Sequence, residues 1–373
     1  MAERATSIAA GALVAEWRTA ALTTAPEEEA IVAFLRERAA AGEPTLAVKI
    51  LSAVGTTFAT TFFLAFLGVS RLIDFTSPGN LVGWGIVAIA GGIVASATLR
   101  RMAVGVGREL TAQATFTAMA IGKVLIVAGV VTWGHGAIQW WTVTAALAAV
   151  TVATYPVSGS SLDRLLSPYA VIASALFDIL ETRVAGAATG ATLTVFFVGL
   201  TAIAGGLLLP MRAPPVLRPI GLAALAGMGT IVAVIASGHD FGIWAGGAAI
   251  DPRGIEAVLT AALAGLIVWA AGGPAAARRE GVVAAVVGAI ALGFIGAPGI
   301  VYALGLLVLG HAHHDRPLRV VGILALPAFV VLWYYGRDMT FLAKSAALVG
   351  SGLVLLAARG FMAWRGLDRR EAA

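Results

Sequence analysis

Apolar runs long enough to cross a membrane recur along this chain from residue 47 to residue 359. A helix needs about 20 predominantly apolar residues to cross about 30 Å of hydrocarbon. The runs therefore predict an all-α protein, a polytopic transmembrane helix bundle of about 12 spans. The predicted spans are 49–69, 80–99, 112–133, 137–156, 166–183, 189–210, 219–238, 254–273, 281–296, 299–312, 317–335 and 340–358.

The overall composition agrees with a protein built for lipid. Hydrophobic residues make up 59% of the 373 residues and charged residues only 12%, with a mean hydropathy of +0.92; a soluble domain carries about 25% charged residues. The 45 glycines favour helices that pack closely in a membrane. The absence of cysteine excludes disulfides, Cys-ligated zinc, iron–sulfur clusters and thiol nucleophiles.

The basic residues are unevenly distributed between the two sides that these spans define. Nineteen of the 25 lysines and arginines fall on the side of the termini, four fall on the opposite side, and Lys123 and Lys344 lie inside spans. Cytoplasmic loops are rich in Lys and Arg, so both termini are predicted to be cytoplasmic, in a bacterial inner membrane. The charges are scattered between apolar runs, so they predict the lipid bilayer as a partner and no nucleic acid.

Three segments differ in composition. Residues 1–46 are predicted to form a cytoplasmic helical segment, in which Thr24 caps a helix that begins with Pro26 and three glutamates. Residues 47–359 form the transmembrane domain, and residues 360–373 form a basic cytoplasmic tail.

The segment 281–312 is broken by Ala297-Pro298-Gly299. Its two runs would form helices of about 24 and 21 Å, which are short for full crossings, whereas one kinked helix of about 48 Å would be too long. The sequence predicts two short helices. They either cross a thinned region or dip as a re-entrant pair, and both alternatives return the chain to the inner side.

Lys123 lies in the middle of its predicted span. A lysine at the bilayer centre costs about 2.5–3.5 kcal/mol, so it is predicted to be buried and paired, with Asp178 as its partner, directly or through water. Asp178 and Glu181 lie three residues apart and share one face of a helix. A structural ion pair is favoured over a proton relay, and a lysine that snorkels to the interface is the third alternative.

The last two predicted spans are joined by a short polar turn. The aromatic cluster 333–335 precedes the turn and is predicted to lie at the outer interface, and Asp338 lies in the turn. Thr340, Lys344 and Ser345 open the last span. Asp338 or Thr340 is expected to cap this helix, and Lys344 is expected to fold back toward Asp338 or a tyrosine hydroxyl. A functional role for Lys344 is the alternative.

With the break and the hairpin placed, the chain resembles a bacterial family of multi-spanning membrane proteins that is catalogued as a domain of unknown function. The resemblance runs from about residue 50 to residue 359, and the last third of the chain carries it. Its motif is an Ala-Pro-Gly break, a helix ending in consecutive tyrosines and a last helix beginning Thr-x-Leu-x-Lys-Ser. The motif positions are Pro298, Gly299, Gly310, Arg316, Tyr334, Tyr335, Thr340, Leu342, Lys344, Ser345 and Gly352.

This resemblance implies a partner but no activity. Members of the family are often encoded beside a second membrane protein with a short Gly-Asp-Tyr signature, which the resemblance implies as a partner. Gly336 stands where a third aromatic residue is common in the family.

No group of residues in the sequence predicts catalysis. The run His311–Asp315 could supply two metal ligands, but no second cluster completes a site, and a solvated loop is the favoured interpretation. Ser345 is not expected to act as a nucleophile, because neither histidine of the outer loops, His135 or His239, is expected to have an ordered acid beside it. The sequence therefore predicts no catalytic residue, no metal and no cofactor.

Two classes of function follow from these features. The first is a non-catalytic membrane subunit or assembly partner of a bacterial envelope complex, favoured by the sparse intramembrane polar groups and the short loops. The alternative is a small-molecule or lipid carrier that uses Lys123, Asp178 and the broken helix 281–312. An enzyme is the third and least favoured class.

Overall fold

The structure, a computed structural model, describes most of the chain between residues 65 and 335. The chain divides into two compact units, unit 1 (residues 1–175) and unit 2 (residues 176–373). The described ranges are 65–99, 101–102, 106–134, 139–182, 187–210, 214–237 and 251–335, with isolated positions in both terminal segments. Within these ranges every regular element is a helix and none is a strand, so the all-α prediction is confirmed there.

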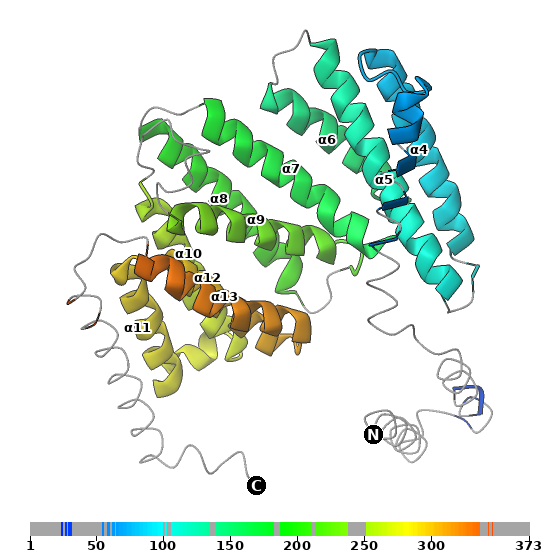
Figure 1. Cartoon of the computed structure of the whole chain (residues 1–373). Coiled ribbons are helices and arrows are strands. Elements are labelled where there is room, and N and C mark those ends of the chain that lie inside the picture. The colour runs from blue at the N-terminus through cyan, green and yellow to red at the C-terminus, as the bar shows by residue number, and fades with distance from the viewer. Residues whose placement is uncertain are drawn as a thin grey trace. The chain divides into compact units, whose positions relative to one another are not determined.

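The helices are named in chain order as Figure 1 labels them. They are α4 (Pro78–Leu99), α5 (Val106–Trp133), α6 (Trp140–Thr154), α7 (Ser161–Thr182), α8 (Ala187–Leu208), α9 (Arg218–Ala236), α10 (Arg253–Ala270), the 3₁₀ helix η2 (Pro274–Arg278), α11 (Glu280–Ile295), α12 (Pro298–Ala312) and α13 (Arg316–Tyr335).

Six helices in the described part of the chain are long and apolar enough to cross a membrane, namely α4, α5, α8, α9, α10 and α13. Three shorter apolar helices, α6, α11 and α12, have 15 or 16 residues. Such a set of helices is typical of a membrane protein. The predicted total of 12 spans stays a prediction, because nearly all of the last span and part of the first lie outside the described residues.

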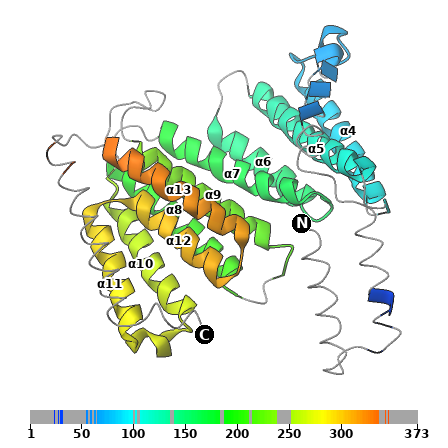
Figure 2. The same cartoon turned by 60° about the horizontal axis from the view of Figure 1, so that its bottom comes forward.

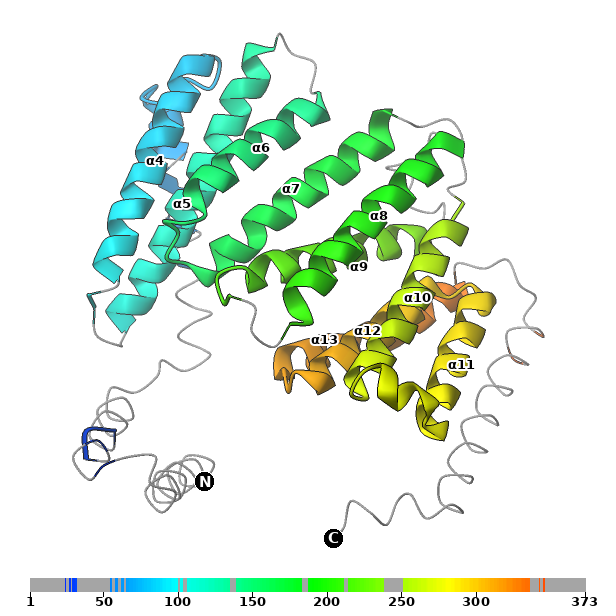
Figure 3. The same ribbon diagram turned by 180° about the vertical axis from the view of Figure 1, so that it is seen from behind.

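Glycines hold α4 and α5 together in unit 1. The two helices run antiparallel and side by side (Figures 1 and 3). A Cβ atom at Gly85 of α4 would lie 2.8 Å from the carbonyl oxygen of Gly122 of α5, and a Cβ at Gly122 would lie 2.7 Å from that of Gly85. Only glycine permits this approach, so the predicted use of glycine for close helix packing is confirmed at this seam.

In unit 2, α10 lies between α11 and α12, and α13 packs along α12 (Figure 2). The α12–α13 contact again relies on glycine. A Cβ at Gly310 would lie 2.8 Å from the backbone nitrogen of Arg319, and a Cβ at Gly299 would overlap the ring of Phe329. Helices α8 and α9 form a second pair, which packs on α10 and α12.

The predicted break between two short helices is confirmed. Helix α11 ends at Ile295, and Gly296 follows in the left-handed conformation with φ of 69°, which glycine adopts at little cost. Pro298 then begins α12, where its missing N–H is not needed for the helix. The two predicted alternatives, that these helices cross the membrane or form a re-entrant pair, both stay predictions.

Helix α7 begins earlier than the predicted span. The span was expected to begin at residue 166, whereas the helix begins at Ser161. Near the N-terminus, Glu27 and residues 29–31 are helical, and Thr24 donates its N–H and its hydroxyl to one Glu27 carboxylate oxygen, each at 2.8 Å. This is half of a capping box, so Thr24 stands where the sequence predicts the helix start.

Candidate functional site

The described part of unit 1 contains a buried ion pair between α5 and α7. The ammonium nitrogen of Lys123 lies 2.6 Å from Oδ1 of Asp163 and 2.6 Å from the hydroxyl oxygen of Ser167. Ser167 in turn donates its hydroxyl to the same carboxylate oxygen at 2.9 Å. Lys123 is 5% exposed, Asp163 2% and Ser167 7%. The three side chains form a closed polar triad, which we call the Lys123 triad.

The sequence of α7 explains how the carboxylate reaches the lysine. Ser160 precedes the helix, and its hydroxyl oxygen accepts the N–H of Asp163 at 3.4 Å, as a cap residue does. Asp163 therefore lies in the first turn, where a carboxylate is also favoured by the helix dipole. Ser167 follows four residues later and lies above Asp163 on the same face of the helix.

On α5, the lysine is placed by the glycine seam. Gly122 fixes α5 against α4, and Lys123 is the next residue, so its side chain leaves the helix about 100° away from the seam. Unit 1 also buries several small hydroxyl side chains outside the triad: Ser96, Thr115, Thr151, Thr154, Ser158 and Ser174.

The predicted partner of Lys123 is wrong. The lysine is buried and paired as predicted, but its carboxylate is that of Asp163 rather than Asp178. Asp178 lies 15 residues further along α7, about 22 Å of helix, so Asp163 and Asp178 cannot serve the same ammonium group. Glu181, one turn beyond Asp178, is exposed.

The sequence prediction missed Asp163 and Ser167 because it placed Asp163 before the start of the span and Ser167 at its very beginning. With the span beginning at residue 166, Asp163 belonged to a loop and could not be considered as a buried counter-ion. The pattern Ser160-x-x-Asp163 is a helix-start signal and could have moved the helix start to the correct place. Once the start is moved, Asp163 becomes a carboxylate inside the bundle.

A second polar site in unit 2 surrounds the α11–α12 break. A pocket of about 170 Å³ lies there between α9, α10, α12 and α13. The motif residues Pro298 and Gly299 line it together with Phe329, Trp333 and Glu256. The sequence prediction also missed Glu256, since a single acidic residue in the first turn of a span carries no distinguishing signal. The pocket brings the break and the aromatic end of α13 together.

The match to a known family covers the chain from before the first predicted span to beyond the last. Residues 45–365 match the family described as a domain of unknown function, DUF4401. The chain belongs to the DUF4401 family. The predicted resemblance to an uncharacterised family of unknown function is thereby confirmed. No curated protein and no solved structure matches the chain.

Several of the predicted motif positions of this DUF4401 chain serve helix packing. Gly299 and Gly310 let α13 approach α12, and Pro298 starts α12. Tyr334 and Tyr335 form the end of α13, and Ser345 is exposed. Asp338, Thr340 and Lys344 lie outside the described residues, so the predicted fold-back of Lys344 stays a prediction.

The histidine run of the DUF4401 chain is split among different contacts. His313 stacks on Trp269 of α10, with ring centroids 5.4 Å apart, and Asp315 pairs with Arg218 of α9. The rings of His311 and His314 lie 6.5 Å apart and are tilted. Among the described residues, no group of three His, Asp or Glu side chains could hold a metal ion.

Proposed function

We propose that this DUF4401 protein is a non-catalytic membrane subunit or assembly partner in a bacterial envelope complex. We place it in the inner membrane as a protein of about 12 spans with both termini cytoplasmic. The uneven distribution of basic residues between the two sides of the predicted spans supports this orientation.

The observation that carries the proposal is the closure of the Lys123 triad. A catalytic or transporting charge must meet a substrate or water, whereas Lys123, Asp163 and Ser167 are each more than nine-tenths buried and satisfy one another. A buried pair of this kind joins two helices in one specific register. The polar chemistry in the described part of unit 1 therefore supports an architectural role.

Recovery of complexes from native membrane tests the proposal. The tagged full-length protein, extracted in a mild detergent and analysed by mass spectrometry, should retain a second membrane protein in a fixed ratio. The double variant Lys123→Met with Asp163→Leu keeps a neutral interior and should still bind the same partner. Recovery of the chain alone from native membrane, after chemical crosslinking as well as without it, would contradict the proposal.

The orientation has its own test. The chain has no cysteine, so single cysteines introduced at Arg101 and Asp251 can be labelled without removing native ones. Both positions are exposed, and the predicted spans place them on opposite sides of the membrane. Membrane-impermeant maleimide applied to sealed vesicles should therefore reach only one of them. Labelling of both from the same side would overturn the orientation.

A small-molecule carrier is the second candidate, and the pocket at the α11–α12 break favours it. Glu256 and Trp333 line this pocket beside a helix break, an arrangement that transporters use for polar substrates. A carrier should show ligand-dependent thermal stabilisation in a library of small cations and amines, and Glu256→Gln should abolish it. An unchanged melting temperature across the library would contradict the carrier function, and the subunit function would then be the remaining proposal.

A further inference from the structure

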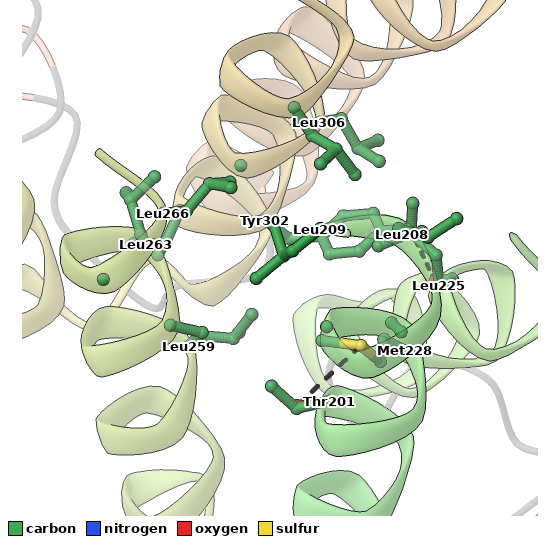
Figure 4. A pocket seen from close by; sticks show the side chains of 17 residues that line it. Thr201, Leu208, Leu209, Leu225, Met228, Leu259, Leu263, Leu266, Tyr302 and Leu306 are labelled. Atoms are coloured by element: carbon green, nitrogen blue, oxygen red, sulfur yellow. Dashed lines mark hydrogen bonds between the residues drawn. The ribbon is translucent and has the colours of Figure 1, made fainter. Parts of the chain in front are cut away.

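Unit 2 contains a partly open apolar cavity of about 420 Å³ that is lined by α8, α9, α10 and α12. In Figure 4, Leu259, Leu263 and Leu266 of α10 line one side of it, and Leu208, Leu225 and Met228 line the other. The cavity is distinct from the pocket at the α11–α12 break, which lies toward the opposite end of α10 and α12.

The cavity offers almost no polar group to a ligand. Its two hydroxyl groups already donate within the protein, Tyr302 to the carbonyl oxygen of Leu225 at 2.8 Å and Thr201 to that of Phe197 at 2.9 Å. An apolar cavity of about 150 Å³ stays dry and binds small hydrocarbons, and water needs two to four polar partners. The lining therefore selects a hydrocarbon group over water or a polar metabolite.

The length of the cavity matches one leaflet of a bilayer. On α12 its lining extends from Val301 to Leu309, which is about 12 Å of helix. The hydrocarbon core is about 30 Å thick, so one leaflet supplies about 15 Å. On α8, α10 and α12 the lining extends toward the helix ends Leu208, Ala270 and Ala312.

These ends meet at one pole of unit 2 and carry basic and aromatic side chains. Three helix faces that line the cavity continue to this pole at helical spacing. At the end of α12, His313 follows Leu309 by four residues, and on α10, Trp269 follows Leu266 by three. On α9, Arg218 precedes Leu225 by seven residues. The stacking of His313 on Trp269 and the pairing of Arg218 with Asp315 show that the faces do meet.

Two buried nitrogen atoms at this pole have no hydrogen-bond partner within the described part of the chain, Nε2 of His313 and Nε of Arg319. Arg319 packs directly on Gly310, the residue that follows the last lining position of α12. A buried nitrogen without a partner has lost its hydrogen bonds to water and gained none in return. A phosphate oxygen would satisfy such donors through charge-assisted hydrogen bonds.

We propose that this cavity holds one acyl chain of an anionic membrane phospholipid, with the phosphate accepting hydrogen bonds from His313 and Arg319. The apolar lining fits the chain, the leaflet depth places its head group at the pole, and the unpartnered nitrogens fit the phosphate. The proposal does not depend on the subunit function, because a bound lipid can be measured without any protein partner.

Native mass spectrometry of the full-length protein in mild detergent tests the chain site. Wild type should retain about one phospholipid per chain. Gly305 lines the cavity and an added Cβ there meets nothing within 4 Å, so Gly305→Leu should fill the space and lower lipid retention at least tenfold. Gly206→Leu is the matched control, because Gly206 is exposed, equally open, and absent from the lining.

Lipid titration of delipidated protein tests the head-group site. Phosphatidylglycerol should raise the melting temperature more than phosphatidylcholine, and Arg319→Gln should remove this preference while retention of a chain persists. Arg278→Gln, at an exposed arginine of η2, should leave the preference intact. Inorganic phosphate alone should have no effect, because the apolar chain supplies most of the binding energy.

Three results would overturn the proposal. They are full lipid retention by Gly305→Leu, stabilisation by inorganic phosphate equal to that by phosphatidylglycerol, and no lipid on the wild-type protein at any detergent concentration. If Gly305→Leu does not fold, Ala262→Leu fills the same cavity from α10 and gives the same decision. Loss of a co-purifying protein, in contrast, bears only on the proposed subunit function.

Discussion

In unit 1 the described helices bury a charged pair and a series of hydroxyl groups, whereas in unit 2 they line an apolar cavity whose few polar groups are already bonded. Both interiors are built from apolar helices that depend on glycine for close approach. A charged pair satisfies itself in only one arrangement, while the walls of an apolar cavity lack van der Waals contacts that a lipid chain can supply. The difference separates a part that fixes helix register from a part that can accept a ligand.

The largest expected effect comes from breaking the charged interior of unit 1. Lys123→Met leaves the Asp163 carboxylate buried without its partner, and such a change costs about 3–5 kcal/mol. Adding Asp163→Leu removes the stranded charge, so the double variant should be more stable than the single one. Thermal unfolding of the purified proteins in detergent measures both.

Asp178→Leu is the matched control for this cycle. Because Asp178 is not the partner of Lys123, its change should add to the effect of Lys123→Met without relieving it. If Asp178→Leu reduced the destabilisation caused by Lys123→Met, Asp163 would not be the partner of the lysine. Additive losses of stability for the changes at Lys123 and Asp163 would contradict the pairing in the same way.

A second, smaller effect should follow from overpacking the α4–α5 seam of unit 1. Gly85→Ala places a Cβ against a backbone oxygen of α5 that cannot move aside, and overpacking costs about 1–3 kcal/mol. Gly83→Ala on the same helix meets nothing within 4 Å and should be neutral or slightly stabilising. Equal melting temperatures for the two variants would contradict the close seam.

The sequence predicts most helices of both units because length and apolarity alone define a spanning helix. The glycine contacts and the break at Gly296 also follow from local chemistry. The partner of Lys123 does not follow, since it depends on where α7 begins and on which face of α7 meets α5. The cavity of unit 2 is invisible in sequence, because Leu and Gly at a lining position look like Leu and Gly in a packed core.

The third prediction compares the α12–α13 contact of unit 2 with the seam of unit 1. Gly299→Ala would place a Cβ 2.8 Å from the Cβ of Phe329 and closer still to its ring. The Cβ of Phe329 is fixed to the backbone and cannot rotate away, so the loss should be about 1–3 kcal/mol, similar to that of Gly85→Ala. Phe329→Ala removes the ring and should relieve part of this loss in the double variant. If Gly299→Ala unfolds the protein as severely as Lys123→Met does, the apolar interior of unit 2 is less tolerant than proposed.

The smallest expected effect concerns Asp74, an exposed carboxylate in the loop before α4. Its Oδ1 accepts the hydroxyl of Thr76 at 2.6 Å and the N–H of Thr76 at 2.9 Å. These bonds favour the ionised form and hold the pKa of Asp74 below its ordinary value of 3.8. A carboxyl group with a lowered pKa adds stability above the pKa of the unfolded chain, and the protein loses it as the pH falls through the lower folded pKa.

Thr76→Val keeps the backbone donor but removes the hydroxyl, which contributes most to the lowered pKa of Asp74. The pKa of Asp74 should therefore rise toward 3.8, and the stability that this group loses on acidification should become smaller and be confined to a narrower pH range. The effect should be small because solvent screens a fully exposed group. Carboxyl-labelled NMR titration of Asp74 measures the shift, and melting temperatures between pH 3 and pH 5 measure its consequence.

In an Asp74→Asn background Thr76→Val should leave the pH dependence unchanged, whereas an unchanged titration in the wild-type background would refute the hydroxyl's role. Such a shift changes only the loop, while the same loss of a hydroxyl at Ser167 acts on a buried charge, so comparing Thr76→Val with Ser167→Ala separates solvent-screened from buried electrostatics within unit 1.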